Sequence, residues 1–369
     1  MEIIISYLKE YYFLGAFCIV LFSFLMSYKL FPVIINLSNV KNLHQEPEER
    51  SSHQHKTPTL GGIGIFFGFT LSIAITGSIL SKHFQSSALL DLIAALLILF
   101  FIGVKDDLID ISPLKKLIAQ LMAASIVLFL SDVHVVTFDG FLGIYELPYI
   151  ISILFTYFAF VLVINAYNLI DGIDGLAASI ALIIFVFFGF YFLINKQITQ
   201  LLISLSLIGP LIAFLKYNVS SKRKIFMGDT GSMVIGFIIV YQSINFLTIN
   251  QTANLPFQLS NGPVFIIALL SFPLLDTLRV FILRVKKGNS PFKADRNHLH
   301  HCFIDYGFSH INSTLIIATL SFIVLLSAFL LQKTNINLEM FIIAFIASGV
   351  YLFITTKIKK GISKKIIST

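Results

Sequence analysis

Four polar residues recur at every third position of the stretch 165–177, between two long apolar runs of the chain. They are Asn165, Asn168, Asp171 and Asp174. If the stretch begins as a helix, residues three apart share one face, and Gly172 and Gly175 predict a tight turn after it. Acids and amides beside hydrocarbon are costly and tend to be functional. Their oxygens suit a hard divalent cation such as Mg²⁺, although a solvated loop that caps helices would use the same residue types.

A second acidic stretch, 105–116, follows another apolar run. Asp106 and Asp107 are adjacent, so their charges repel unless a cation intervenes. Together with Lys115 and Lys116, these carboxylates are typical of a site that holds a metal and a phosphate. The alternative interpretation is a charged loop beside the membrane.

A further carboxylate is predicted on a turn in the stretch 226–232, where Gly228 and Gly231 bracket Asp229. The turn should open a helix, and exposed backbone N–H groups at a helix start attract phosphate. Phe226 could stack on a base, although a single Phe more often packs in the membrane. For Asp229, a simple helix cap is the alternative.

The polar loop 284–301 contains Arg and His side chains that suit a diphosphate. They are Arg296, His298, His300 and His301. Zinc binding is the alternative, but neither an HExxH motif nor paired cysteines accompany the histidines. Earlier in the chain, Asp276 lies three residues before Arg279, and we expect the two to form a buried structural ion pair.

The composition indicates a polytopic membrane protein. Of 369 residues, 57% are hydrophobic and only 12% are charged, whereas about a quarter of a soluble domain is charged. The lipid bilayer is therefore an expected partner. The net charge of +7 is attributed to cytoplasmic Lys and Arg, so no nucleic-acid partner is expected. Cys18 lies in an apolar run and Cys302 in a polar loop, which argues against a disulfide.

Long runs of apolar residues predict an all-α protein with about 11 transmembrane helices in a single domain, 1–369. The apolar runs are 13–37, 61–81, 88–104, 115–131, 147–165, 176–194, 199–217, 231–249, 262–283, 314–332 and 338–356. One set of connecting loops carries 22 of the 26 Lys and Arg residues, which predicts that this set is cytoplasmic, with the N-terminus outside and the C-terminus inside. All the stretches described above border or lie in this set.

The motifs together resemble the polyprenyl-phosphate N-acetylhexosamine-1-phosphate transferases, which form glycosyltransferase family 4 with the muramoyl-pentapeptide translocase. The resemblance covers about residues 38–310 and rests on five motifs in order. They are TPTLGG at 57–62, DDLIDISPLKK at 106–116, NAYNLIDGIDGLA at 165–177, FMGDTGS at 226–232 and SPFKADRNHLHH at 290–301. The last motif differs from the His-His-His run of the peptidoglycan translocases and resembles the branch that uses UDP-N-acetylglucosamine.

The resemblance implies transfer of a sugar 1-phosphate from a UDP-N-acetylhexosamine, with UDP-N-acetylglucosamine favoured, to undecaprenyl phosphate or another polyprenyl phosphate. UMP would be released, and lipid-linked cell-envelope polysaccharide synthesis would begin. The implied location is the cytoplasmic face of the bacterial inner membrane. The implied cofactor is Mg²⁺, with Mn²⁺ as the alternative. The resemblance is also compatible with a homodimer. Another UDP-N-acetylhexosamine or UDP-MurNAc-pentapeptide is the alternative donor.

The resemblance also implies residue roles. Asp229 and Asn168 would hold the metal, and Asp106 and Asp107 would face the lipid phosphate and the metal. The catalytic set is completed by Asp171 and Asp174 in the nucleotide pocket. The predicted substrate-binding set is Asn165, Phe226, Lys115, Arg296, His298, His300 and His301.

A membrane transporter is the alternative from another class. Its ionisable residues would lie near the middle of the membrane and would appear in both halves of the chain as weak repeats. Here they crowd one set of loops, which favours an enzyme. The transferase interpretation requires these loops to meet in one pocket.

Overall fold

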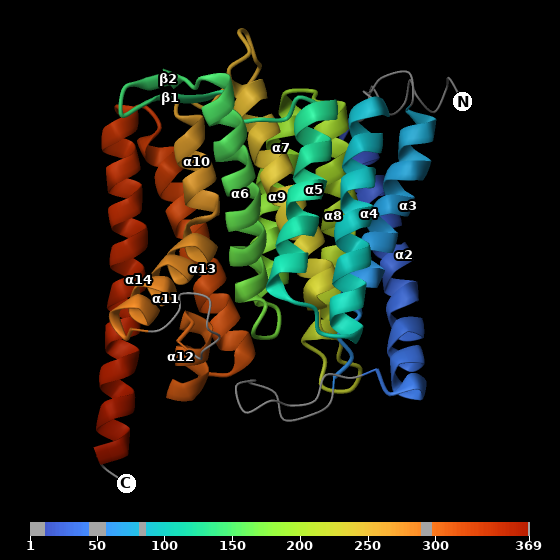
Figure 1. Cartoon of the computed structure of the whole chain (residues 1–369), viewed down its shortest axis with the longest axis vertical. Helices are drawn as coiled ribbons and strands as arrows, with labels where there is room; N and C mark the ends of the chain where they lie inside the picture. Colours follow the sequence, from blue (N-terminus) through green and yellow to red (C-terminus); the bar gives the residue numbers. More distant parts are fainter. Residues whose placement is uncertain (1–11, 44–56, 81–85, 289–296, 368–369) are drawn as a thin grey trace.

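A computed structural model describes residues 12–43, 57–80, 86–288 and 297–367, and within these ranges the chain is a bundle of helices (Figure 1). The helices are α2 (Tyr12–Lys41), α3 (Gly61–Ile79), α4 (Ser86–Leu108), α5 (Pro113–Leu130), α6 (Tyr149–Ile170), α7 (Leu176–Ile194), α8 (Ile198–Asn218), α9 (Gly228–Asn250), α10 (Gly262–Leu269), α11 (Ser271–Lys286), α12 (Leu299–Tyr306), α13 (His310–Leu331) and α14 (Ile336–Ile367). The predicted all-α membrane class is confirmed.

The number of spans differs slightly from the prediction. Among the described residues, nine helices are long and apolar enough to cross a membrane, and the pair α10 and α11 would make a tenth. That pair is bent by 65°, so the predicted run 262–283 forms either a broken span or a re-entrant loop. The predicted run 338–356 falls in α14, of which Ile336–Leu352 counts as a shorter apolar helix.

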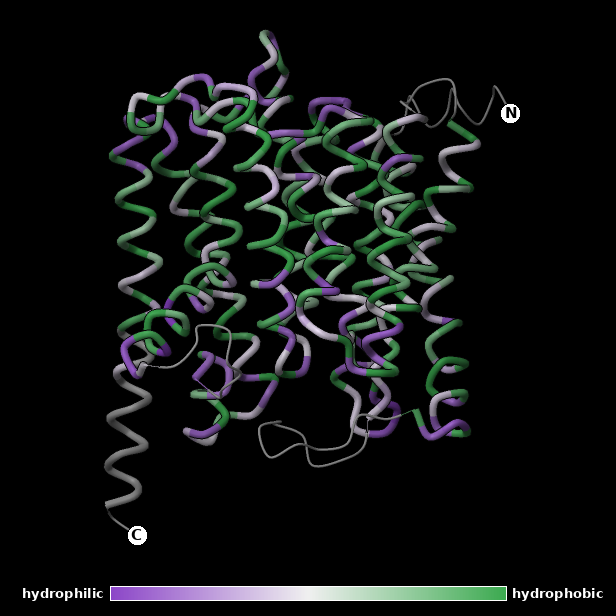
Figure 2. Tube along the Cα trace, viewed as in Figure 1, coloured by the Kyte–Doolittle hydropathy of each residue, from purple (hydrophilic) through white to green (hydrophobic). Residues whose placement is uncertain are grey.

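One loop forms strands, which the helical periodicity did not predict. β1 (Thr137–Phe141) pairs antiparallel with β2 (Ile144–Glu146) at one end of the bundle. The turns that carry the acidic motifs and α12 lie at the opposite end (Figure 1). Hydrophilic residues gather at both ends, with an apolar middle between them (Figure 2). The cytoplasmic assignment of the motif-bearing end stays a prediction.

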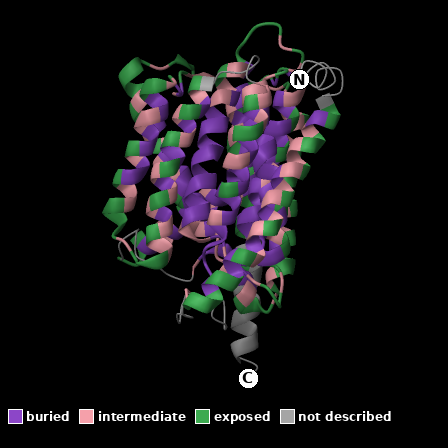
Figure 3. Ribbon diagram, turned by 90° about the vertical axis from the view of Figure 1, so that its right-hand side faces the viewer, coloured by how far each residue is buried: buried purple, intermediate pink, exposed green. Residues whose placement is uncertain are grey.

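The interior of the bundle is formed by α7, α8 and α9. In an 18-residue apolar stretch of α9, 78% of the residues are buried, against 28% in a stretch of equal length in α2. Buried residues accordingly gather in the middle of the bundle (Figure 3). The N-terminal end of this central helix carries Asp229, so a buried element fixes the position of a motif residue.

Glycines bring two peripheral helices onto the start of α9. A Cβ on Gly62 of α3 would lie 2.2 Å from the Gly231 nitrogen, and a Cβ on Gly103 of α4 would lie 2.4 Å from Thr230 Cα. The N–H of Gly62 donates to the Met227 carbonyl at 2.8 Å. The glycines of the TPTLGG motif therefore allow a close backbone approach to the chain's own FMGDTGS segment.

We predict that Gly62→Ala destabilises the protein, because its Cβ would meet backbone atoms that cannot rotate away. Overpacking of this kind costs about 1–3 kcal/mol, which a lowered midpoint of thermal unfolding in detergent would report. Gly349→Ala in α14 is the matched control, since nothing lies within 4 Å of its Cβ position. Equal midpoints for the two variants would contradict the close packing at Gly62.

Candidate active site

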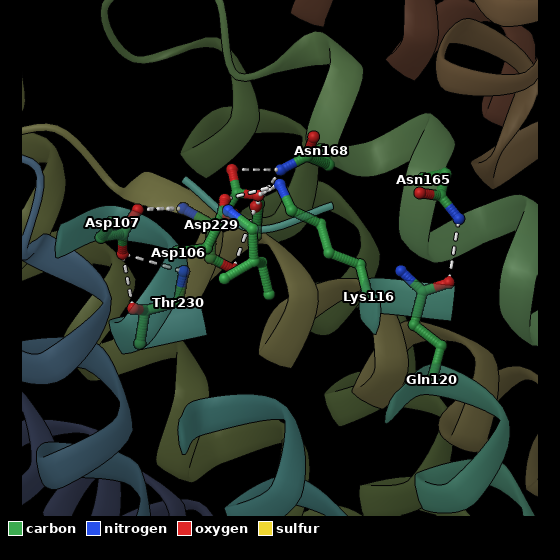
Figure 4. A network of polar contacts seen from close by, with 10 residues as sticks. Asp106, Asp107, Lys116, Gln120, Asn165, Asn168, Asp229 and Thr230 are labelled. Atoms are coloured by element: carbon green, nitrogen blue, oxygen red, sulfur yellow. Dashed lines mark hydrogen bonds and ion pairs between the residues drawn. The ribbon is translucent and has the colours of Figure 1, made fainter. Parts of the chain in front are cut away.

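Lys116 joins two of the acidic motifs. Its ammonium lies 2.5 Å from Asp106 Oδ2 at the end of α4 and 2.5 Å from Asp229 Oδ2 at the start of α9 (Figure 4). The Asp106 side chain is 10% exposed and the Asp229 side chain 24% exposed. One cation thus compensates two largely buried carboxylates from helices far apart in the sequence.

Asn168 holds the other side of the Asp229 carboxylate. Its Nδ2 donates to Asp229 Oδ1 at 2.9 Å and lies 2.7 Å from Ser232 Oγ. Asn168 comes from the last turn of α6, so α4, α5, α6 and α9 all contribute to one cluster. We call Asp106, Lys116, Asn168 and Asp229 the acidic cluster.

Asp107 binds the backbone at the start of α9. Its Oδ1 accepts the Asp229 N–H at 2.7 Å, and its Oδ2 accepts the Thr230 N–H at 3.1 Å and the Thr230 hydroxyl at 2.5 Å. The predicted phosphate site on these N–H groups was therefore wrong, because a carboxylate already satisfies them. Asp106 and Asp107 do not converge on one cation, since neighbours on a helix point about 100° apart.

The turn after α6 contains two carboxyls in different surroundings. Asp174 Oδ2 lies 2.6 Å from Lys224 Nζ and 3.1 Å from His310 Nδ1. Burial alone would raise the pKa of Asp174, but the hydrogen bonds and charges of His310 and Lys224 outweigh it and lower the pKa. Asp174 is thus ionised and paired within the protein.

Asp171 has no such compensation. Among the described residues, no side chain is found hydrogen-bonded or ion-paired to its carboxyl. Burial, followed by repulsion from Asp229, Asp107 and Asp174, raises the pKa of Asp171 well above its usual range. A divalent cation beside it would relieve that repulsion.

The histidine loop packs against the same turn. A Cβ on Gly172 would lie 2.2 Å from His300 Nε2, so only glycine leaves room for this ring. His300 is 1% exposed, and within the described ranges neither ring nitrogen has a hydrogen-bond partner. Burial, and after it the neighbouring His301, lower the pKa of His300 well below its usual range, so the ring is neutral.

Asp276 anchors the histidine loop. Its Oδ2 lies 2.7 Å from His298 Nδ1, its Oδ1 accepts the Leu299 N–H at 2.9 Å, and the Tyr351 hydroxyl also binds it. The expected pairing with Arg279 was wrong. Arg279 instead donates to the Asn297 carbonyl at 2.6 Å. Helix α11 thus holds the start of α12 through two side chains, and His298 serves as an anchor.

Comparison with known proteins agrees with these motifs. The profile of Glycosyl transferase family 4 matches residues 89–247. The chain is 32% identical over 288 residues to decaprenyl-phosphate N-acetylglucosaminephosphotransferase of Mycolicibacterium smegmatis, covering 73% of this chain and 71% of the relative. The chain belongs to glycosyltransferase family 4. The predicted resemblance is confirmed.

Two further relatives in the family share the name undecaprenyl-phosphate alpha-N-acetylglucosaminyl 1-phosphate transferase. The protein of Salmonella typhi is 29% identical over 273 residues, covering 72% of this chain and 70% of the relative. The protein of Escherichia coli K12 is 26% identical over 319 residues, covering 83% of each chain. The segment matched by the family profile runs from α4 to α9 and contains the whole acidic cluster.

Not every predicted site residue of this family 4 protein reaches the acidic cluster. Asn165 is exposed and donates to Gln120 Oε1 at 3.0 Å, apart from Asp229 (Figure 4). Lys115 is also exposed. The Phe226 ring lies under Lys224 Nζ, 5.4 Å from its centroid, beside the turn that holds Asp174. Arg296 lies outside the described residues. The His298 ring stacks on His300 with centroids 5.7 Å apart, and the His301 ring lies 4.2 Å from His300 at a tilt of 52°.

Lys116 was named beside Lys115 in the acidic stretch, but only Lys115 was placed in the predicted substrate-binding set, although the spacing along the helix distinguishes the two. Along α5, the buried residues Ala119, Gln120 and Ala123 lie three, four and seven positions after Lys116. They share its face. Exposed Ile118 and Met122 instead follow Lys115 at the same helical spacing. The interior face of α5 therefore carries Lys116 and not its neighbour.

The donor set fits a divalent metal of the Mg²⁺ type. Carboxylates of Asp229, Asp106 and Asp171 and the amide of Asn168 offer hard oxygens, and no cation among the described residues compensates the Asp171 carboxyl. Within the described residues, no group of three or more His, Cys, Asp or Glu side chains is arranged to hold a metal. Lys116 lies between two of the carboxylates, which keeps them ion-paired to an ammonium.

We predict that Lys116→Gln lowers the rate of sugar-phosphate transfer by about 10²–10³, the usual cost of removing one preorganised charge-stabilising donor. Lys115→Gln is the matched control, one residue away and exposed. It should retain activity within about twofold, because no anionic partner of its ammonium is found in the part of the chain that the structure describes, and an exposed charge contributes little. Transfer by purified variants with labelled donor measures both. Similar losses in the two variants would show that general basic charge, and not the position of Lys116, matters.

Proposed function

We propose that the protein transfers N-acetylglucosamine 1-phosphate from UDP-N-acetylglucosamine to undecaprenyl phosphate, releases UMP and starts lipid-linked cell-envelope polysaccharide synthesis. The names of the relatives support this donor and acceptor. The observation that carries the proposal is the acidic cluster, in which Lys116 bridges Asp106 and Asp229 at one end of a membrane bundle. The departure of the loop 295–301 from a His-His-His run favours this donor over UDP-MurNAc-pentapeptide.

The position of the cluster suits two substrates of opposite solubility. The polyprenyl chain stays in hydrocarbon and the nucleotide comes from water, so their phosphates can meet only at the membrane surface. All elements of the cluster end or begin at one end of the bundle (Figure 1). The excess of Lys and Arg in the corresponding loops supports a cytoplasmic location. A transporter would instead hold its ionisable residues near the middle of the membrane.

Asp229 and Asn168 would hold Mg²⁺, and Asp106 and Asp171 would add negative charge to the surroundings of the metal. When bound, the metal would supply charge neutralisation for the diphosphate of the donor. Lys116 would turn from its carboxylate partners toward the same phosphates, and the anchored histidine loop would close the other side through His300 and His301. The main role of these side chains is to bring two anions together.

The acceptor needs little help from a base. A phosphate monoester has a second pKa of about 6, so most of it is a dianion at neutral pH. An oxygen of the acceptor attacks the phosphorus next to the sugar, the bond from that phosphorus to the bridging oxygen breaks, and UMP leaves with the bond electrons. Asp106 remains the nearer of the paired aspartates to these reactants, because its carboxylate lies in the acidic cluster.

The donor can be identified by exchange of UMP. Purified protein, undecaprenyl phosphate, Mg²⁺ and a panel of UDP-sugars are incubated with labelled UMP. Because each step of the transfer is reversible, we expect label in UDP-N-acetylglucosamine and in no other UDP-sugar. Label in UDP-MurNAc-pentapeptide or in another UDP-N-acetylhexosamine would replace the proposed donor, and no label at all would refute the reaction.

The metal role of Asp229 is tested by Asp229→Ala. We expect nearly complete loss of product with the protein still inserted in the membrane, because both Lys116 and Asn168 lose their shared partner. Asp110→Ala is the control, an exposed carboxylate in the same motif as Asp106. Activity of Asp229→Ala within about twofold of the parent would exclude Asp229 as a required metal ligand, since loss of one such group costs about 10²-fold or more.

A further inference from the structure

Asp107 is turned away from the acidic cluster. Both of its oxygens point to the N-terminal end of α9, where they accept three hydrogen bonds from Asp229 and Thr230. Figure 4 shows Asp107 and Thr230 on one side of Asp229, with Lys116 on the other. We propose that Asp107 is a positioning residue that orients Asp229 by capping α9, and that it does not touch the reactants. This inference rests on the proposed function.

The cap satisfies a need of the helix itself. The first N–H groups of a helix lack partners within it, and a negative charge there is stabilised by the helix dipole. Thr230 is fully buried, so its hydroxyl has no access to substrate or solvent. The hydroxyl is 2.5 Å from Asp107 Oδ2 and turns the cap into a three-point attachment.

Two glycines make this attachment possible. Gly228 has a φ of +69°, and a Cβ there would lie 2.6 Å from both Asp107 oxygens. Gly103 lies one turn before Asp107 on the same face of α4. A Cβ on Gly103 would lie 2.4 Å from Thr230 Cα, so only glycine fits there. The backbones of α4 and α9 therefore approach closely enough for the short Asp107 side chain to reach the helix end.

The consequence for Asp229 is that its main chain and its side chain are fixed separately. Asp107 holds its backbone N–H, while Lys116 and Asn168 hold its carboxylate. Loss of the cap would loosen the first turn of α9, and the Asp229 carboxylate would then no longer be held in one orientation. Asp106, the neighbour in sequence, lacks this attachment and faces the acidic cluster.

Thr230 offers a test that leaves every carboxylate in place. Thr230→Val removes the hydroxyl and keeps the shape, whereas Thr230→Ser keeps the hydroxyl. Binding of Mn²⁺ to detergent-solubilised protein without substrates is measured by electron paramagnetic resonance. We expect Thr230→Val to weaken Mn²⁺ binding by about tenfold, as loss of a charge-assisted hydrogen bond would do. Thr230→Ser should bind Mn²⁺ within about twofold of the parent.

A second variant, Asp107→Asn, keeps the proposal testable if Thr230→Val does not fold. It should also weaken Mn²⁺ binding and raise the Mg²⁺ concentration needed for half-maximal transfer, while the KM for undecaprenyl phosphate stays within about twofold. In the double variant, the losses should be smaller than additive, because both substitutions break one attachment.

Three results would overturn the proposal. One is parental Mn²⁺ binding in Thr230→Val, and a second is equal weakening in Thr230→Val and Thr230→Ser. The third is an Asp107→Asn protein with parental Mn²⁺ binding and a raised KM for the acceptor, which would place Asp107 on the lipid phosphate. Failure of the proposed function is distinguishable, because the parent would then show no UMP exchange while the Mn²⁺ measurements, made without substrates, would be unaffected.

Discussion

Carboxylates at the end of a membrane bundle need compensating charge, and the arrangement of this protein depends on how that need is met. Lys116 supplies one ammonium to Asp106 and Asp229, and Lys224 and His310 compensate Asp174. Among the described residues, no cation compensates Asp171, and burial together with repulsion from Asp229, Asp107 and Asp174 raises its pKa well above the usual range. Such a carboxyl stays neutral until a divalent cation binds beside it. The electrostatics thus separate structural carboxylates from those available to substrates.

Positioning of these charges depends on close contact between backbones. Residues of the TPTLGG and FMGDTGS motifs share hydrogen bonds between main chains, and Gly103 brings α4 onto Thr230. Any side chain at these glycines would separate α3 or α4 from α9. Because α9 is the most buried helix, a shift at its start could not be absorbed without disturbing the packed interior. The motif glycines therefore contribute to the site through packing and not through flexibility.

The histidine loop is held by a different part of the chain. The 65° bend between α10 and α11 carries Asp276 to the start of α12, where it binds His298 and the Leu299 N–H. His300 is then pressed onto Gly172. This contact joins the described part of the last motif, residues 297–301, to the turn after α6. Segments far apart in the sequence therefore meet at one end of the bundle.

The sequence by itself determined the membrane class, the separation of polar loops from apolar runs, the family and the presence of Asp106, Asn168 and Asp229 in the site. The membrane class and the arrangement of the loops depend on composition and local spacing, which are properties of a chain segment. The family and the three site residues were instead predicted from the resemblance of five short motifs to known transferases. Only the tertiary structure decided that Lys116 and not Lys115 enters the acidic cluster, that Asn165 pairs with Gln120, and that Asp276 pairs with His298. It also decided that Asp107 caps α9. The physical reason is that the partner of a polar side chain depends on how each helix is rotated and on which helix lies beside it, and both are set by packing between segments distant in sequence.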